Sequence, residues 1–351
     1  QGVRDVLPAA DITVLPLADG GDGTAEVICD ALAGRWVNCR AHDPLGREID
    51  CRYVHVDRLQ LAVIEMSEAA GMRRLPAKDR DPLRANTFGV GQMILHAARY
   101  GAREIIVGLG GSATNDGGFG MARALGYRFF AVDDTQLRIA VSKLDKLKVI
   151  ERPRHLKLPA IVAATDVQNP LLGKNGSSEI YGPQKGADNA AIKVLECALK
   201  KFAGVAAKEF GVDYRDRPGA GAAGGLGFGL MMFAGALVRP GFDIVSEIVG
   251  LESKIRNADV VITGEGRLDK QTLEGKTPAG VARLARKLGK RIFAIVGEAT
   301  EDIGAGKLFD GVYEVRQAGV TQAQSIETAS DLLRKRGQEL ARLLDGGTAA
   351  G

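Results

Sequence analysis

Three segments of the chain follow one plan, in which a short run rich in β-branched residues precedes a glycine-rich polar loop and then a helix. The runs, loops and helices are residues 13–15, 18–23 and 24–32 in the first segment, 105–107, 108–118 and a helix up to 125 in the second, and 260–262, 264–276 and 278–288 in the third. Strand–loop–helix units at this spacing predict an α/β fold with mostly parallel sheets. Ligands of such sheets bind beyond the carboxyl ends of the strands, so we expect these loops to carry the functional site.

A different pattern lies between the first two segments. A β-meander is predicted over residues 37–40, 51–56 and 61–64, with a turn at 43–46. A chain of 351 residues suits two domains, and we expect a mixed-sheet domain to begin near this meander. Farther along, the pattern predicts a strand over 291–296 and a surface helix over 325–344.

Charge and composition exclude several classes of protein. The hydrophobic share of 45% and the charged share of 26% are ordinary for a soluble globular protein. The net charge of +4 is spread along the chain without a basic block, which argues against a nucleic-acid partner. The longest apolar stretch, residues 226–238, is too short and too rich in glycine to span a bilayer, and no signal peptide is evident. We therefore expect no membrane association.

Cysteine and histidine are sparse and scattered. The four cysteines form no CxxC pair, and the four histidines do not cluster with them. This pattern argues against a zinc site or a disulfide framework and indicates reduced thiols in the cytoplasm.

The loops contain the groups that phosphoryl transfer needs, namely phosphate donors, carboxylates for Mg²⁺ and an acceptor for the proton of the nucleophile. In the first loop, PLADGGDGT (16–24), Asp19 and Asp22 are candidates for metal or base, although aspartate is also an ordinary turn residue. The glycines, Gly20 and Gly21 among them, let the backbone approach a phosphate closely.

The second loop, GLGGSATNDGG (108–118), is the richest in candidate ligands. Hydroxyls, an amide and a carboxylate follow two glycines, in the order Gly110, Gly111, Ser112, Thr114, Asn115 and Asp116. Its first half also matches the dinucleotide fingerprint GxGxxA, with an acid downstream at Asp133 or Asp134, which would indicate a dehydrogenase. The run of residues 115–118 interrupts the helix that this fingerprint requires, so a wider phosphate cradle is favoured.

The third loop mixes acids and bases before a helix that Thr277 and Pro278 start. Its candidate residues for a phosphate–Mg²⁺ site are Gly264, Glu265, Arg267, Asp269 and Lys276, and the alternative is a solvated loop with surface ion pairs. Two more glycine-rich stretches are GPQKGA (182–187), which presents Lys185, and PGAGAAGGLG (218–227), whose glycines could serve packing alone. Neither a Walker A sequence nor a protein-kinase motif set is present.

Six motifs, taken together and in order, carry a resemblance to a known family. They are PLADGGDGT, GLGGSATNDGG, TDVQNPLLG (165–173), GPQKGA, PGAGAAGGLG and TGEGRLDKQT followed by GKTPAGVA. This set, over residues 14–300, resembles the bacterial glycerate kinase family of the ATP-dependent glycerate 2-kinase type. The resemblance implies a Rossmann-like (flavodoxin-like) parallel-sheet domain, residues 1–36 with 243–351, and an inserted mixed α/β domain, residues 37–242, with the active site in the cleft between them. It also implies ATP, Mg²⁺ and D-glycerate, with 2-phosphoglycerate favoured as product.

Within that resemblance the residues receive provisional roles. Arg267 or Lys185 would hold the substrate carboxylate, and Asp19 or Asp116 would orient the reacting hydroxyl. The triphosphate would lie on residues 110–118, where Lys276 would neutralise the transferred group. The Mg²⁺ ligands would come from the set Asp116, Asp166 and Glu265.

Three features depart from the family pattern. The family's first strand and an Asp-Ser-Phe-Lys segment have no counterpart, so we expect a strand and part of a helix to precede Gln1. The region of residues 134–142 lacks the usual extra glycines and prolines. Gln168 stands where an acid is expected, which favours Asp166 as metal ligand. Other readings stay open, namely a kinase of a related hydroxy or sugar acid, a non-catalytic phosphometabolite-binding protein, and a homodimeric assembly.

Overall fold

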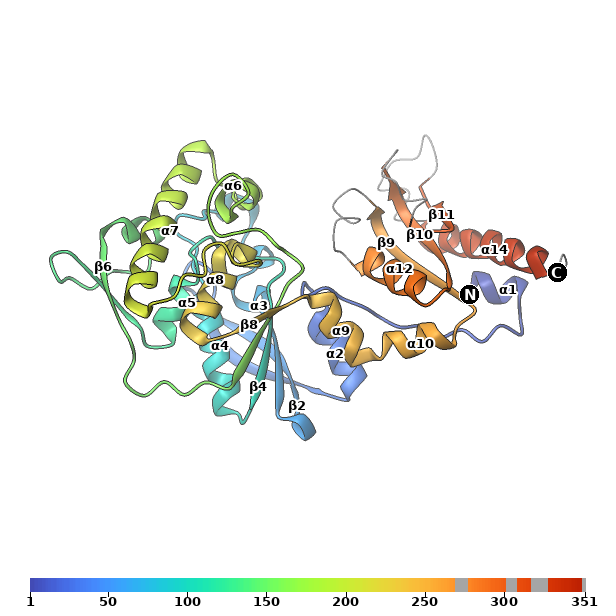
Figure 1. Ribbon diagram of the computed structural model, residues 1–351, viewed down its shortest axis with the longest axis horizontal. Coiled ribbons are helices and arrows are strands. Elements are labelled where there is room, and N and C mark those ends of the chain that lie inside the picture. Colours follow the sequence, from blue (N-terminus) through green and yellow to red (C-terminus); the bar gives the residue numbers. More distant parts are fainter. Residues whose placement is uncertain (269–276, 301–307, 317–327, 349–351) are drawn as a thin grey trace. The chain divides into compact units, whose positions relative to one another are not determined.

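The computed structural model describes residues 1–268, 277–300, 308–316 and 328–348 (Figure 1). The chain forms two compact units. The large unit comprises residues 17–249, and the small unit comprises residues 1–16 together with 250–351. The chain passes from the small unit to the large unit after residue 16 and returns after residue 249. From the sequence, these two boundaries were expected after residues 36 and 242. The helix that follows the first loop belongs to the large unit.

A six-stranded mixed sheet forms the centre of the large unit. Its strands lie in the order β1 (Arg35–His42), β2 (Glu48–Val56), β3 (Leu61–Glu65), β4 (Glu104–Gly108), β7 (Ala160–Ala164) and β8 (Leu237–Arg239). The first three strands are antiparallel and form the predicted meander, whereas β3, β4, β7 and β8 run parallel. The carboxyl ends of these four strands therefore share one edge of the sheet.

Helices cover both faces of this sheet (Figure 1). The α-helices of the large unit are α2 (Thr24–Leu32), α3 (Ser67–Ala70), α4 (Phe88–Arg99), α5 (Phe119–Ala124), α6 (Ser177–Tyr181), α7 (Asn189–Phe210), α8 (Ala222–Ala234) and α9 (Gly241–Val249). Short 3-10 turns lie at Asp57–Leu59, Met72–Arg74, Ala77–Asp79, Val141–Lys146 and Pro183–Lys185, and β5 (Arg128–Ala131) and β6 (Leu147–Glu151) form a hairpin-like pair.

Alternate strand residues divide the core into two layers. Ile64 and Val107 pack with apolar residues of α4, α5, α7 and α8, while Val63 and Ile106 pack with those of α2 and α9. All five residues of β3 are buried, as expected for a parallel strand that is covered on both faces. Packing on both faces holds the sheet in place, and with it the edge from which the glycine-rich loops leave.

The small unit contains a three-stranded parallel sheet in the order β11-β10-β9. Its elements are α1 (Gly2–Val6), α10 (Leu251–Asn257), β9 (Val260–Leu268), α12 (Thr277–Lys287), β10 (Arg291–Ala299), β11 (Gly311–Glu314) and α14 (Ala329–Thr348). The start of the chain joins this unit because α1 packs on α14, where Arg334 donates to Asp5 at 2.6 Å. The predicted helix after Thr277 and the strand beginning at Arg291 are both present.

One predicted strand is wrong. Residues 13–15 form no strand, and Val14 is 82% exposed. This segment lies in the stretch that leads from the small unit into the large one, where no neighbouring strand pairs with it. The mixed α/β class predicted from the sequence is nevertheless confirmed. Among the described helices, none has the length and apolar character needed to cross a membrane.

Candidate functional site

Two of the glycine-rich loops meet at the carboxyl edge of the large sheet. Glu65, Gly108 and Ala164 stand beside one another in register at the ends of β3, β4 and β7. The amide of Gly110 donates to the carbonyl of Gly20 at 3.2 Å, which joins the second loop to the first. A Cβ atom on Gly110 would lie only 2.3 Å from the Cα of Gly21, so the two backbones touch here.

The first loop is held by side chains at the end of β3 and just after it. One oxygen of Glu65 accepts from the amides of Gly23 and Ala25, both at 2.9 Å, and so binds the start of α2. Burial raises the pKa of Glu65, while these two amides oppose that shift. The hydroxyl of Ser67 donates to Asp22 at 2.5 Å. The position of Asp22 is thus set by a residue 45 positions away.

Asp19 and Asp166 form a pair of partly buried carboxylates at this edge. Burial, and after it the charge of Asp19, raises the pKa of Asp166 to about 6. The amide of Phe242, at the start of α9, donates to Asp166 across 3.4 Å. A divalent cation would relieve the repulsion between the two carboxylates, and Mg²⁺ usually takes one or two protein carboxylates together with substrate phosphates. Across the described part of the chain, no group of three or more metal-binding side chains is assembled.

Asp116 of the second loop lies entirely inside the protein. Its two oxygens accept from the amides of Thr87 at 2.9 Å, Gly118 at 3.1 Å and Gly120 at 2.9 Å, and from the hydroxyl of Thr87 at 2.9 Å. The side chain has no solvent exposure, and burial raises its pKa. The carboxylate therefore joins the starts of α4 and α5, two elements that pack together.

Lys185 is also buried, and it reaches the second loop from the Pro183–Lys185 turn. Its Nζ donates to Oγ of Ser112 and to the carbonyl of Thr114, both at 2.7 Å. Burial lowers the pKa of Lys185 to about 7, although the negative charge of Asp116 opposes that shift. Among described residues, Oγ1 of Thr114 and Oδ1 of Asn115 are buried without a hydrogen-bond partner. Buried oxygens without a partner in a loop at the sheet edge fit a place where a bound hydroxyl group or a water molecule supplies the missing donor.

The glycine-rich stretch of residues 218–227 packs against the same loop. The amide of Gly117 donates to the carbonyl of Gly224 at 3.0 Å. A Cβ on Gly224 would lie 1.9 Å from the carbonyl oxygen of Thr114, and its φ of +67° also favours glycine. These glycines therefore let the backbone of residues 218–227 pack directly against the backbone of the second loop.

Sequence reasoning missed a group of residues that follow β3. Glu68 is buried and accepts from Arg73 at 2.5 Å and from Arg74 at 2.8 Å. The signal was present, because Glu65, Ser67 and Glu68 come directly after the apolar run of residues 61–64. The rule that places ligands at strand ends applies to this strand as well.

The third loop belongs to the small unit and begins later than predicted. Gly264, Glu265 and Arg267 lie within β9, where Glu265 pairs in register with Val296 of β10. The expected start of the loop at residue 264 is therefore wrong, since the strand continues to Leu268. Asp269 and Lys276 lie outside the described residues.

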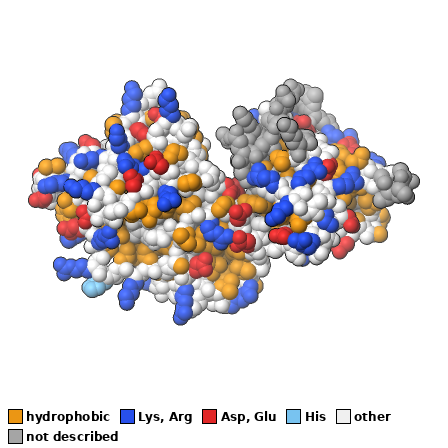
Figure 2. Space-filling model, in the orientation of Figure 1, with side chains coloured by type: hydrophobic (Ala, Val, Ile, Leu, Met, Phe, Trp, Pro, Cys, Tyr) orange, Lys and Arg blue, Asp and Glu red, His pale blue; other side chains and the backbone are white. Residues whose placement is uncertain are grey.

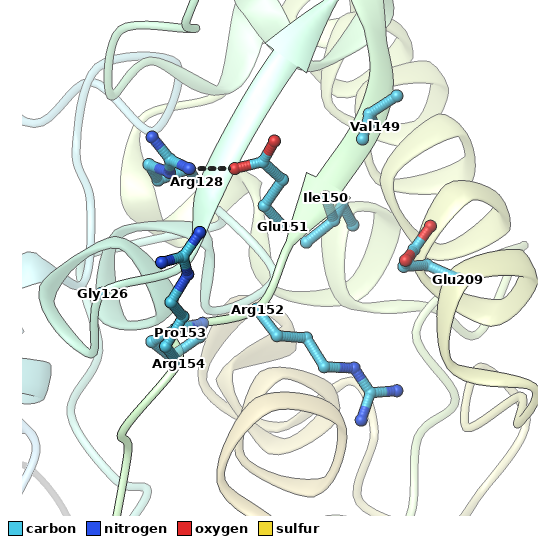
Figure 3. Close-up of a pocket in the computed structure, with 9 residues that line it drawn as sticks. All are labelled: Gly126, Arg128, Val149, Ile150, Glu151, Arg152, Pro153, Arg154 and Glu209. Atoms are coloured by element: carbon cyan, nitrogen blue, oxygen red, sulfur yellow. Dashed lines mark ion pairs between the residues drawn. The ribbon is translucent and has the colours of Figure 1, made fainter.

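A separate hollow of about 630 Å³ lies at the β5–β6 pair (Figure 3). It is lined by residues of these strands and by the ends of α5 and α7, including Arg128, Glu151 and Arg152, and Arg128 pairs with Glu151 (Figure 3). None of the sheet-edge residues described above lines it. Figure 2 shows lysines and arginines interspersed with acidic and apolar side chains over the face in view, in keeping with the small net charge.

Comparison with known proteins decides the family. The sequence pattern of the Glycerate kinase family matches residues 1–345. The chain belongs to the glycerate kinase family. The resemblance inferred from the six motifs is thus confirmed. Membership places the chain among kinases, phosphotransferases with an alcohol acceptor, which use ATP.

The names of similar proteins agree with this placement. Glycerate 2-kinase of Escherichia coli K12 is 40% identical over 350 residues, which cover 98% of this chain and 92% of that protein. Glycerate kinase of Halalkalibacterium halodurans is 41% identical over 320 residues, covering 90% of this chain and 82% of that protein. A solved structure, "Crystal structure of putative glycerate kinase 2 from Salmonella typhimurium LT2", superposes with a TM-score of 0.84 at 40% identity, covering 99% and 92% of the two chains.

The groups at the sheet edge can be compared with those that a kinase reaction requires. A kinase must place a triphosphate, its cation and an acceptor hydroxyl close together. The large unit supplies two touching glycine-rich loops, a carboxylate pair and unpaired buried oxygens at one edge. Of the residues predicted from the sequence, this edge gathers Asp19, Gly20, Gly21, Gly110, Gly111, Ser112, Thr114, Asn115, Asp116, Asp166 and Lys185.

Proposed function

We propose that the protein transfers the γ-phosphoryl group of ATP to a hydroxyl of D-glycerate, with 2-phosphoglycerate as the product. The observation that carries this proposal is the match to glycerate 2-kinase of Escherichia coli at 40% identity over 98% of the chain. The contact between the loops of Gly20 and Gly110 supports it, because it brings the predicted phosphate and carboxylate groups to one edge. The choice of the 2-hydroxyl rests on the name of that relative.

We assign the cation to Asp19 and Asp166. Their mutual repulsion and their partial exposure suit a site that Mg²⁺ shares with phosphate oxygens. When bound, the cation would neutralise charge on the phosphates. Asp19 is also our candidate for accepting the proton of the acceptor hydroxyl, since its carboxylate is tied only to the amide of Gly21 at 3.2 Å within the described chain.

Two predicted site residues, Asp116 as catalytic and Lys185 as substrate-binding, receive a different role in this proposal. Asp116 has no exposed surface and accepts from four donor groups, so we infer that it holds the loop and contacts neither metal nor substrate. Lys185 is buried with its Nζ on Ser112 and Thr114, and we infer that it acts on the loop in the same way. Glu265, Arg267 and Lys276 of the small unit remain proposed phosphate or metal ligands on the strength of their motif.

The decisive experiment is incubation with ATP, Mg²⁺ and D-glycerate followed by phosphorus NMR of the product. We expect a single monoester resonance with the coupling of a phosphate on the carbon that bears one proton. Coupling to a methylene group would instead identify 3-phosphoglycerate. The variant Asp19→Asn serves as the control and is expected to be inactive while folded. Absence of product with D-glycerate, but turnover of another hydroxy acid, would contradict the assigned substrate.

Assembly and location are further proposals. We retain a homodimer and a cytoplasmic location, neither of which contributes to the site described here. Analytical ultracentrifugation checks the first, and a monomer at micromolar concentration would exclude it.

A further inference from the structure

Arg73 is positioned by the same loop that forms the phosphate cradle. It lies in the Met72–Arg74 turn, directly after Gly71, which forms a β-bridge with Ser112. The amide of Met72 donates to the carbonyl of Gly111 at 2.8 Å. The two residues that precede Arg73, Gly71 and Met72, are therefore both bound to the second loop.

The guanidinium of Arg73 is anchored along one side only. Its Nη2 donates to Glu68 at 2.5 Å and lies 4.0 Å from Oε2 of Glu65, and its Nε donates to the carbonyl of Ser67 across 3.4 Å. Its Nη1 has no hydrogen-bond partner among the residues that the structure describes. The side chain is 44% exposed. One edge of the guanidinium is thus held in place, and the other can meet a ligand without further ordering.

The neighbouring cations are engaged differently. Arg74 is 26% exposed, and its guanidinium donates to Glu68 and to the carbonyl of Asp50. Lys185 is fully buried with its ammonium on loop atoms. Lys185 serves the protein's own groups, and Arg74 makes one more hydrogen bond than Arg73 among the described residues and is less exposed, so Arg73 presents the more accessible donor edge beside the second loop.

A carboxylate substrate needs such a cation at this edge. Asp22 and Glu65 place negative charge at the end of the first loop, and Glu68 adds to it beside Arg73, which repels an acid but not a neutral alcohol. An arginine presents donors whose spacing matches the two oxygens of a carboxylate. On the basis of the proposed function, we infer that Arg73 binds the carboxylate of the hydroxy-acid substrate. It thereby sets the preference of the enzyme for an acid over a neutral alcohol.

The test compares D-glycerate with D-glyceramide, in which an amide replaces the carboxylate, at saturating ATP. For Arg73→Gln we expect KM for D-glycerate to rise roughly 10- to 100-fold, the effect of losing hydrogen bonds to a charged group. The KM for ATP and the kcat/KM for D-glyceramide should change less than about threefold, so the preference for the acid collapses. Glu68 keeps Arg74 as its partner, which lets the variant fold.

Two further variants complete the design. Arg73→Lys retains the positive charge without the fork and should give a KM between those of the wild type and Arg73→Gln. Arg74→Gln removes the neighbouring guanidinium and should leave the ratio of the two substrates unchanged. An unchanged ratio in both Arg73 variants, with an active wild type, would overturn the inference alone. A wild type that phosphorylates neither compound would overturn the proposed function and this inference with it.

Discussion

Lys185 and Ser112 are joined by a buried hydrogen bond of 2.7 Å from Nζ to Oγ, across 73 positions of sequence. The same ammonium donates to the carbonyl of Thr114, so one side chain fixes two points of the second loop. Burial of a lysine opposes its charged state, and the pKa of about 7 records that cost. We infer that the lysine offsets this cost by holding the second loop in position.

The variant Lys185→Met should therefore separate activity from stability. Methionine fills a similar volume without a donor, so removal of the buried charge offsets part of the lost hydrogen bonding and we expect little change in Tm. A displaced loop should lower kcat/KM on the order of 100-fold, the effect of about 1 Å of misplacement. Steady-state kinetics and thermal unfolding check both points. Lys193→Met, at an exposed position of α7, is the matched control. Wild-type kinetics in Lys185→Met would contradict the positioning role.

Asp116→Asn should destabilise the fold. An amide nitrogen would face backbone N–H groups that now donate to a carboxylate oxygen, which leaves buried donors unpaired. Each unpaired buried group costs about 1–3 kcal/mol, so we expect a loss on the order of 3 kcal/mol in the free energy of unfolding. Urea denaturation measures it. Asp188→Asn is the control, because Asp188 is an exposed N-cap at which asparagine is equally suitable. Full stability combined with lost activity would instead support the catalytic role that the motif suggested.

Local sequence patterns predicted where the loops lie, but not the surroundings of their side chains. The strand-end rule located the second loop, which follows β4, because the rule depends only on local pattern. The first loop was found by its composition although no strand precedes it, and Asp166 was found through the family motif alone. The rule could not show that Asp116 is buried, since its partner Thr87 stands 29 positions earlier. The ion-pair network of Glu68, Arg73 and Arg74 was missed because no glycine-rich motif marks that strand end.

The third loop illustrates a different limit. Gly264, Glu265, Gly266 and Arg267 have the composition of a turn, yet they continue β9 in parallel pairing with β10. Pairing with a neighbouring strand outweighs the low strand propensity of glycine, and that neighbour is some thirty residues away in sequence. Residues 13–15 show the converse, because a β-branched run without a neighbouring strand forms no strand.

Gly110→Ala tests whether the two loops must touch. The added Cβ would lie 2.3 Å from the Cα of Gly21, a backbone atom that cannot rotate away. Overpacking of this kind costs about 1–3 kcal/mol, and we expect a lower Tm together with reduced kcat/KM. Gly204→Ala is the control, since an added Cβ in this position of α7 meets nothing within 4 Å. It should stabilise the protein by about 0.5–1 kcal/mol through helix propensity. Equal behaviour of the two variants would refute the importance of the contact.

Asp166 gives the stability of the metal-free protein a defined pH dependence. Its pKa is about 6 in the folded protein against 3.8 for an unperturbed aspartate, through burial first and then the charges of Asp19 and Asp243. Between these values the folded state retains a proton that the unfolded state loses. This group therefore makes stability fall as pH rises from about 4 to about 6, and the loss persists above that range. Asp166→Asn should remove this part of the slope, and Asp19→Asn should shift it to lower pH.

Magnesium provides the complementary measurement on the same pair. If Asp19 and Asp166 hold the cation, Mg²⁺ must compete with the proton on Asp166, so its stabilising effect should be small at pH 5 and large at pH 7.5. Thermal unfolding with EDTA or with Mg²⁺, at both pH values, checks this expectation. In Asp166→Asn the difference between the two solutions should shrink at pH 7.5 to the level seen at pH 5. A magnesium effect that is equal at both pH values, or that survives in Asp166→Asn, would place the cation on other residues.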